Sequence, residues 1–221
     1  MPCRAKKLFT ATSLLQLLAF PVLGPAAPAS SAPAESLRGD KSPPRLSVRV
    51  YSFAGLSPWL LHAGEVEAYR LLRKVPVDLN WVDCTSALAS AACVSDLAPT
   101  DLVIRILPKA LPLATADALG IAGSQGGEAK AFLFYDRMVA LRTHARPLPS
   151  IVGRVLAHEI VHVLLPDQSH SDFGLMRGQW STDDLLMASS ACLALPAASV
   201  RLMEKEALRR VLNGRSLITP Q

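Results

Sequence analysis

One pattern in the second half of the sequence limits the possible folds most, because it places side chains that commonly bind metal ions at helical spacing. His158, Glu159 and His162 form the pattern His-Glu-x-x-His within an apolar stretch. On an α-helix, residues four apart lie on one face, so the two histidines can direct their imidazoles at a single ion. This is the spacing of zinc-binding helices. Glu159 projects about 100° away, where it can reach a water on the metal without ligating the metal.

The residues around this pattern predict a helix that packs on a hydrophobic core. On a helical wheel, one apolar stripe lies apart from the two histidines and contains Val152, Leu156, Ile160, Val163 and Leu164. Gly153 and Ala157 flank this stripe and would let the helix approach a sheet closely. Pro149 with Ser150 marks the start of the helix. Pro166 marks its end, because the residue before a proline disfavours helical dihedrals.

A third histidine follows at a distance from which it can return to the same ion. His170 lies eight positions after His162, beyond the chain reversal that Pro166 permits. Three histidine nitrogens and one open position are the coordination of a catalytic zinc, whereas structural sites usually have four protein ligands. We therefore predict that His158, His162 and His170 bind Zn²⁺ and that Glu159 is the general base.

These residues, followed by Gly174-Leu175-Met176, resemble the motif of the metzincin zinc metallopeptidases. That motif has two histidines and a glutamate on one helix, then a third histidine, then a methionine-containing turn beneath the metal. The stretch from His158 to Trp180 is also similar to a set of uncharacterised secreted bacterial proteins. The resemblance implies a zinc-dependent endopeptidase acting on peptide or protein substrates, with Met176 packing beneath the metal. It also implies that a strand at 131–135 forms the upper rim of the cleft and pairs with an extended substrate.

The spacing after the helix departs from the metzincin motif, and this leaves three alternatives. Leu165 and Gln168 stand where the motif has a glycine and the third histidine, and His170 comes two residues later. The first alternative is a non-catalytic secreted zinc-binding or partner-binding protein with a degenerate metzincin site. The second is a zinc peptidase whose third ligand is Asp183 or Asp184. The third is a chance motif in a metal-free domain.

The first residues of the chain have the features of a secretory signal. A basic start, an apolar run at 8–23 and small residues after it predict a cleaved signal and a loose mature start within residues 1–34. We then expect a flexible lead-in at 35–45, one metallopeptidase-like domain at 46–215 and a tail at 216–221. Export implies a secreted or periplasmic protein with no membrane association after signal cleavage.

Charge and cysteine content narrow the partners further. The formal net charge is +5, and the basic start of the signal supplies much of it. No basic run with interleaved aromatic residues is present, which argues against nucleic-acid binding. In an exported protein, Cys84 and Cys93 are expected to form a local disulfide, with Cys192 left free or paired elsewhere. Other pairings are compatible with the sequence, which sets no oligomeric state.

The order of the remaining elements predicts an α/β fold. Apolar runs and alternating patterns predict four strands, at 46–53, 77–82, 101–107 and 131–135. Helices are expected from Pro58 through Lys74 and at 199–212, and the glycine-rich stretch at 120–127 is expected to be a flexible turn. We expect a metzincin-like zincin: a mixed, mostly parallel four-stranded sheet packed by an N-terminal helix and the His-Glu-x-x-His helix, with a small, mostly helical C-terminal part.

Overall fold

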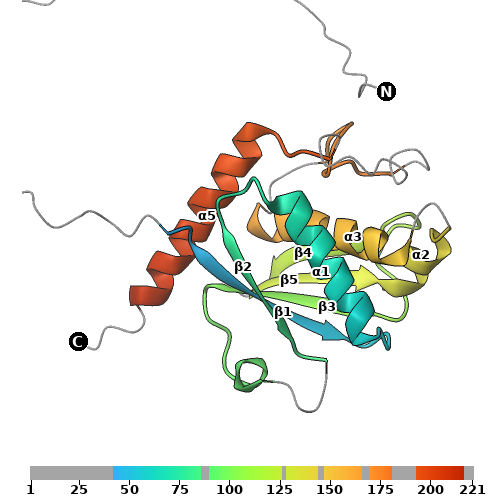
Figure 1. The fold of residues 1–221 in the computed structure, drawn as a ribbon, viewed down its shortest axis with the longest axis horizontal. Helices are drawn as coiled ribbons and strands as arrows, with labels where there is room; N and C mark the ends of the chain where they lie inside the picture. Colours follow the sequence, from blue (N-terminus) through green and yellow to red (C-terminus); the bar gives the residue numbers. More distant parts are fainter. Residues whose placement is uncertain are drawn as a thin grey trace, which may run out of the picture. The chain divides into compact units, whose positions relative to one another are not determined.

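The computed structural model (Figure 1) describes residues 42–85, 90–125, 128–143, 147–165, 170–180 and 193–216. Its internal contacts divide the chain after Ser42, and all the described helices and strands belong to the part that follows. The predicted signal at 1–34 lies outside the described residues. Of the helices in the described part, none is long and apolar enough to cross a membrane.

A five-stranded mixed sheet forms the centre of the fold. In spatial order its strands are β2 (Asp78–Asp83), β1 (Arg45–Ser52), β3 (Asp101–Leu107), β5 (Glu128–Phe134) and β4 (Gly120–Gln125). The first four pair in parallel, and β4 runs antiparallel to β5 along the edge. The prediction of a mixed, mostly parallel sheet is confirmed, whereas the predicted number of four strands is wrong.

The additional strand, β4, lies where the sequence indicated a flexible turn. Gly120 and Gly123 weaken the strand pattern of this stretch, because glycine adds no side chain that packs on a sheet. The pairing with β5, from Gly120 opposite Leu133 to Gln125 opposite Glu128, nevertheless gives the segment a regular ladder. As a result β5 is an interior strand, and the predicted cleft rim at 131–135 is wrong: β4 is the edge.

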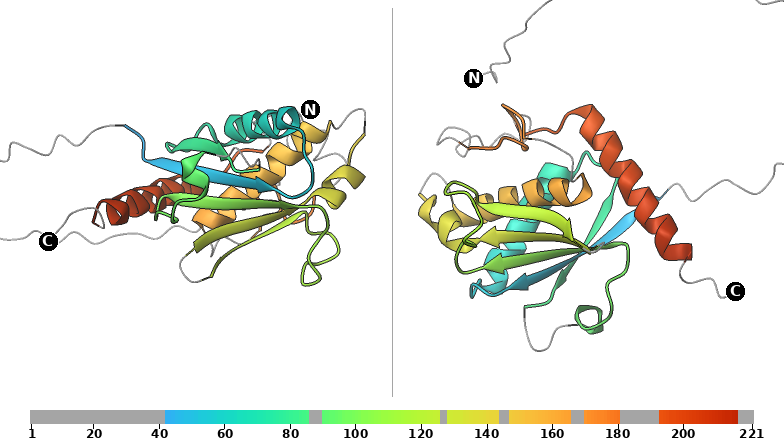
Figure 2. Two further views of the ribbon diagram at one scale, coloured as in Figure 1. Left: turned by 90° about the horizontal axis from the view of Figure 1, so that it is seen from below. Right: turned by 180° about the vertical axis from the view of Figure 1, so that it is seen from behind.

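Two helices lie over the same face of the sheet (Figure 2). They are α1 (Pro58–Leu72), and α3 (Leu148–Leu164), which carries the His-Glu-x-x-His pattern and contacts α1, β4 and β5. The helix α1 begins as predicted, with the Ser57 side chain accepting a hydrogen bond of 3.2 Å from the Leu60 N–H. It ends two residues before the predicted Lys74.

The two helices approach each other closely at a pair of glycines. A Cβ atom at Gly153 would lie 2.5 Å from Cβ of Glu67 and 2.6 Å from the carbonyl oxygen of Gly64. A Cβ atom at Gly64 would lie 2.7 Å from Cγ1 of Val152. Gly153 therefore faces α1, and the prediction that it lets the helix approach the sheet is wrong.

The helix α3 is buried on nearly all sides. The predicted apolar stripe belongs to the hydrophobic core, with Val152, Leu156 and Ile160 fully buried. Most other positions of the helix are buried as well, which is the pattern of a helix enclosed by other elements. Packing around the whole helix therefore fixes the positions of His158, Glu159 and His162.

The remaining elements surround this core. Cys84, after β2, forms a disulfide with Cys93 at the end of the 3₁₀ helix η1 (Ala91–Cys93), which confirms that pairing. Cys192 lies outside the described residues. A short helix, α2 (Tyr135–Ala140), follows β5 directly. The last helix, α5 (Ala197–Ser216), is longer than the predicted 199–212 and continues through Asn213 and Gly214.

Candidate metal centre

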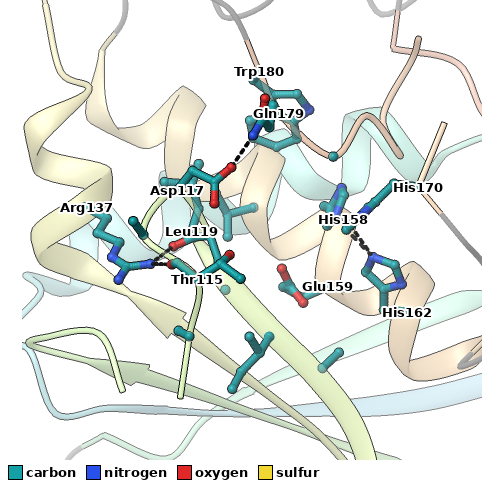
Figure 3. Close-up of a pocket in the computed structure, with 18 of the residues that line it drawn as sticks. Thr115, Asp117, Leu119, Arg137, His158, Glu159, His162, His170, Gln179 and Trp180 are labelled. Carbon is teal, nitrogen blue, oxygen red and sulfur yellow. Dashed lines mark hydrogen bonds between the residues drawn. The ribbon is translucent and has the colours of Figure 1, made fainter. Parts of the chain in front are cut away.

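Three imidazoles converge beside the C-terminal half of α3 (Figure 3). Nε2 of His158 lies 3.1 Å from Nε2 of His162 and 3.3 Å from Nε2 of His170. The third side of this triangle, between His162 and His170, measures 3.2 Å. The first two histidines are one helical turn apart, and the third returns from the segment after the helix, as predicted from the sequence.

The triangle has the size that a tetrahedral zinc ion requires. Zn–N bonds of about 2.0–2.1 Å at tetrahedral angles place ligand nitrogens about 3.3 Å apart. The observed separations of 3.1–3.3 Å match this value without any movement of the three rings. A cluster of three histidines can thus hold one metal ion and leave one coordination position open.

The ring of His158 is held in the form that binds metal. Its Nδ1–H donates a hydrogen bond of 2.8 Å to the carbonyl oxygen of Leu175, which leaves the lone pair of Nε2 directed at the other histidines. Burial lowers the pKa of His158 to about 4; the Leu175 hydrogen bond opposes this in part, and His162 and His170 add smaller lowering effects. His158 is therefore neutral at pH 7, and neutral imidazole is the ligand form.

A turn after α3 supplies both His170 and the carbonyl that orients His158. Gly174 has a φ angle of +79°, a left-handed conformation that favours glycine, and a Cβ there would lie 2.9 Å from the carbonyl oxygen of Ala194. The Ser171 N–H donates to the carbonyl oxygen of Met176 at 2.7 Å, which closes the turn. The Met176 side chain is 2% exposed and packs in the hydrophobic core.

Glu159 lies next to this cluster as a buried carboxyl group with no hydrogen-bond donor among the described residues. Its side chain is almost fully buried, and burial raises its pKa to about 8. The carboxyl group lies against the edge strand, since a Cβ at Gly120 would be 2.7 Å from Oε1 of Glu159. Glycine at this position therefore makes room for the carboxyl group between α3 and β4.

The three histidines and Glu159 line a cleft of about 1060 Å³. One wall consists of the β3–β4 loop (residues 113–119) and the first residues of β4, and another consists of residues 177–180. Trp180 stands edge-on to His158, with ring centroids 5.6 Å apart. Arg137 of α2 supports the loop by donating from Nη1 to the carbonyl oxygens of Ala118, at 2.6 Å, and Thr115.

The sequence did not indicate the cleft walls. Gly120, Arg137 and the 113–119 loop carry no motif, and only tertiary packing brings them to the histidines. The competing carboxylate ligands, Asp183 and Asp184, lie outside the described residues.

Comparisons with known proteins find two distant structural likenesses. No family model matches the sequence, and neither does any curated protein. Among solved structures, the chain is similar to metalloproteinase-II from Bacteroides fragilis, at 15% identity and a TM-score of 0.49, over 75% of this chain and 53% of that one. It is also similar to archaemetzincin from Methanopyrus kandleri, at 17% identity and a TM-score of 0.47, over 78% of this chain and 98% of that one. The chain thus spans about half of the length of the first and nearly all of the second.

Proposed function

We propose that this protein is a zinc-dependent peptidase that hydrolyses peptide bonds in peptide or protein substrates. One observation carries the proposal: three imidazole nitrogens form a triangle of zinc size next to a buried carboxyl group that lines an open cleft and has no partner among the described residues. A purely structural site has no use for Glu159, because burying a carboxyl group without a hydrogen-bond donor costs stability. A cation held by the histidines would supply the charge partner that this carboxyl group lacks.

His158, His162 and His170 would hold the zinc ion through their Nε2 atoms. When bound, zinc lowers the pKa of a water molecule and polarises a carbonyl group. Glu159 takes the proton of the attacking water on a carboxylate oxygen and passes it to the nitrogen of the leaving amine. The Leu175 carbonyl keeps His158 in the required tautomer.

The edge strand supports a peptide substrate over other acyl compounds. Gly120, Ile121 and Ala122 of β4 line the cleft, and β4 pairs with another strand only on its β5 side within the described sheet. An extended peptide can add to such an edge through main-chain hydrogen bonds. We assign this role to β4 in place of the strand at 131–135.

We also propose that the protein is exported. The features of the first 34 residues support this. The disulfide between Cys84 and Cys93 supports it too, because such bonds persist in oxidising compartments.

Metal analysis combined with a cleavage assay tests the function. The purified protein should contain one zinc per chain and cleave a peptide library, and a chelator should stop cleavage until zinc is restored. Glu159→Gln should keep the zinc and lower the rate by about 10²–10⁴-fold, the typical contribution of a general base. His170→Ala should lose zinc, whereas the matched control His62→Ala should not, because His62 is an exposed residue of α1 outside the cluster.

The outcomes separate the proposal from its rivals. Full zinc content without cleavage of any library member supports the non-catalytic alternative. Unchanged zinc content in His170→Ala excludes that residue as a ligand. A wild-type protein that binds no zinc refutes the metal site altogether.

A further inference from the structure

A hydrogen bond joins the two walls of the cleft. The side-chain amide of Gln179 donates to a carboxylate oxygen of Asp117. Asp117 belongs to the β3–β4 loop, and Gln179 belongs to the segment that follows the turn at Gly174. Both residues line the cleft that holds the three histidines and Glu159. We call this contact the Asp117–Gln179 bridge.

The bridge lies at the mouth of the cleft. Asp117 and Gln179 are both exposed, whereas Glu159 is 4% exposed and lies deeper in the same cleft. Figure 3 shows the bridge in the same cleft as the three histidines and Glu159, with the Asp117 carboxylate and the Gln179 amide directed at each other. The bridge therefore spans the cleft on its solvent side, between the β3–β4 loop and the segment at 177–180.

On the loop side, the carboxylate of Asp117 is held ready for its partner. The hydrogen bond from Gln179 lowers the pKa of Asp117, with further lowering from Thr115 and from its own backbone N–H. Arg137 fixes the same loop from the other side through the carbonyl oxygens of Thr115 and Ala118. The loop is thus anchored to α2 by a cation and to the opposite wall by one exposed hydrogen bond.

On the other side, the residues around Gln179 contact the metal cluster. A Cβ atom at Gly178 would lie 3.1 Å from the ring of His170, so this backbone runs directly against that histidine. Trp180 stands against the ring of His158. Gln179, between them, is therefore on a segment that contacts two of the three histidines.

We propose that the Asp117–Gln179 bridge restricts the substrates of this site to short peptides. The proposal rests on the peptidase function proposed above. A short peptide can enter the cleft by its end and lie beneath the bridge. An internal segment of a long chain can bind beneath the bridge only if one end of the chain passes under it or if the hydrogen bond between Asp117 and Gln179 breaks. One exposed hydrogen bond of this kind shifts such an opening equilibrium by about threefold to tenfold.

The test compares one cleavage sequence in two contexts. A fluorogenic peptide of about eight residues and the same sequence inside a long unstructured polypeptide are cleaved by the wild type, Asp117→Ala, Gln179→Ala and the double variant. Each single variant should raise the ratio of long-chain to short-peptide kcat/KM by about threefold to tenfold. The double variant should add nothing, because both changes remove the same contact. Asp96→Ala is the control, since this exposed carboxylate lies outside the cleft.

Hydrogen exchange gives a readout that does not depend on activity. Amide exchange at residues 113–119 should be faster in Asp117→Ala and in Gln179→Ala than in the wild type and the control. If either variant fails to fold, the other still reports on the contact. An unchanged cleavage ratio, or unchanged exchange in the loop, overturns the restriction while the peptidase function stands. A wild type that cleaves neither substrate refutes the function, and the restriction falls with it.

Discussion

Replacing Glu159 by glutamine should remove a loss of stability that the metal-free protein undergoes as the pH rises to neutral. Burial raises the pKa of Glu159 from 4.5 to about 8, so the folded state favours the neutral acid. The unfolded state ionises above pH 4.5. The free energy of unfolding is therefore unaffected by Glu159 below about pH 4.5, where the group is neutral in both states. It falls as the pH rises from 4.5 towards 8. At pH 7 the loss is about 3 kcal/mol, from about 2.5 pH units at 1.36 kcal/mol each.

The measurement is urea unfolding of chelator-treated wild type and Glu159→Gln from pH 4 to pH 8. The buried amide has its own cost, but that cost does not change with pH. His158, whose burial lowers its pKa to about 4, costs both proteins stability as the pH falls from 6.5 towards 4, so its effect cancels in the difference. The free-energy advantage of the variant should thus rise by about 3 kcal/mol between pH 4 and pH 7.

A difference in unfolding free energy that stays constant with pH would refute this reasoning. It would mean that the carboxyl group of Glu159 finds solvent or a donor in the metal-free fold. The buried carboxyl group would then need no bound cation as a charge partner.

Three other substitutions test the packing around the site. Gly120→Ala should push the neighbouring carboxyl group out of place and lower peptidase activity by about 100-fold with zinc retained. Its control is Gly123→Ala on the same strand, because a Cβ there has no atom within 4 Å; equal activity in the two would contradict the close approach. Gly153→Ala should cost about 1–3 kcal/mol in urea unfolding by forcing α1 and α3 apart. Replacing Cys84 and Cys93 by serine should cost about 2–3 kcal/mol for a loop with a sequence separation of 9, and reduction of the wild type should match it.

The central part of the site could be predicted from the sequence because it depends on local geometry. His158 and His162 meet through the helical repeat alone, and the apolar stripe that buries α3 follows the same repeat. His170 could be named as well, since a helix that ends near Pro166 leaves few places for the next histidine. The structure brings its ring to 3.2–3.3 Å from the other two.

The rest of the site depends on contacts between distant parts of the chain. Gly120 and Gly123 suggested a turn, yet pairing with β5 makes this segment the edge strand and one wall of the cleft. A glycine on a helix indicates that another element packs closely there, but the sequence does not say which element. Gly153 was expected to face the sheet, whereas its neighbour in the structure is α1. The bridge between Asp117 and Gln179 joins residues 62 positions apart and has no sequence pattern.

The charge state of the metal-free site argues that the fold is adapted to a cation. At pH 7, burial keeps His158 neutral, with a pKa of about 4, and keeps Glu159 protonated, with a pKa of about 8. The fold thus holds Glu159 in the uncharged form, which water would not favour at pH 7, and no described residue donates a hydrogen bond to this carboxyl group. A divalent cation on the three nitrogens removes this conflict, since it binds neutral imidazole and favours an ionised carboxylate nearby. The same ion that makes the catalytic base competent would therefore also stabilise the fold, which is why metal content and unfolding free energy should change together.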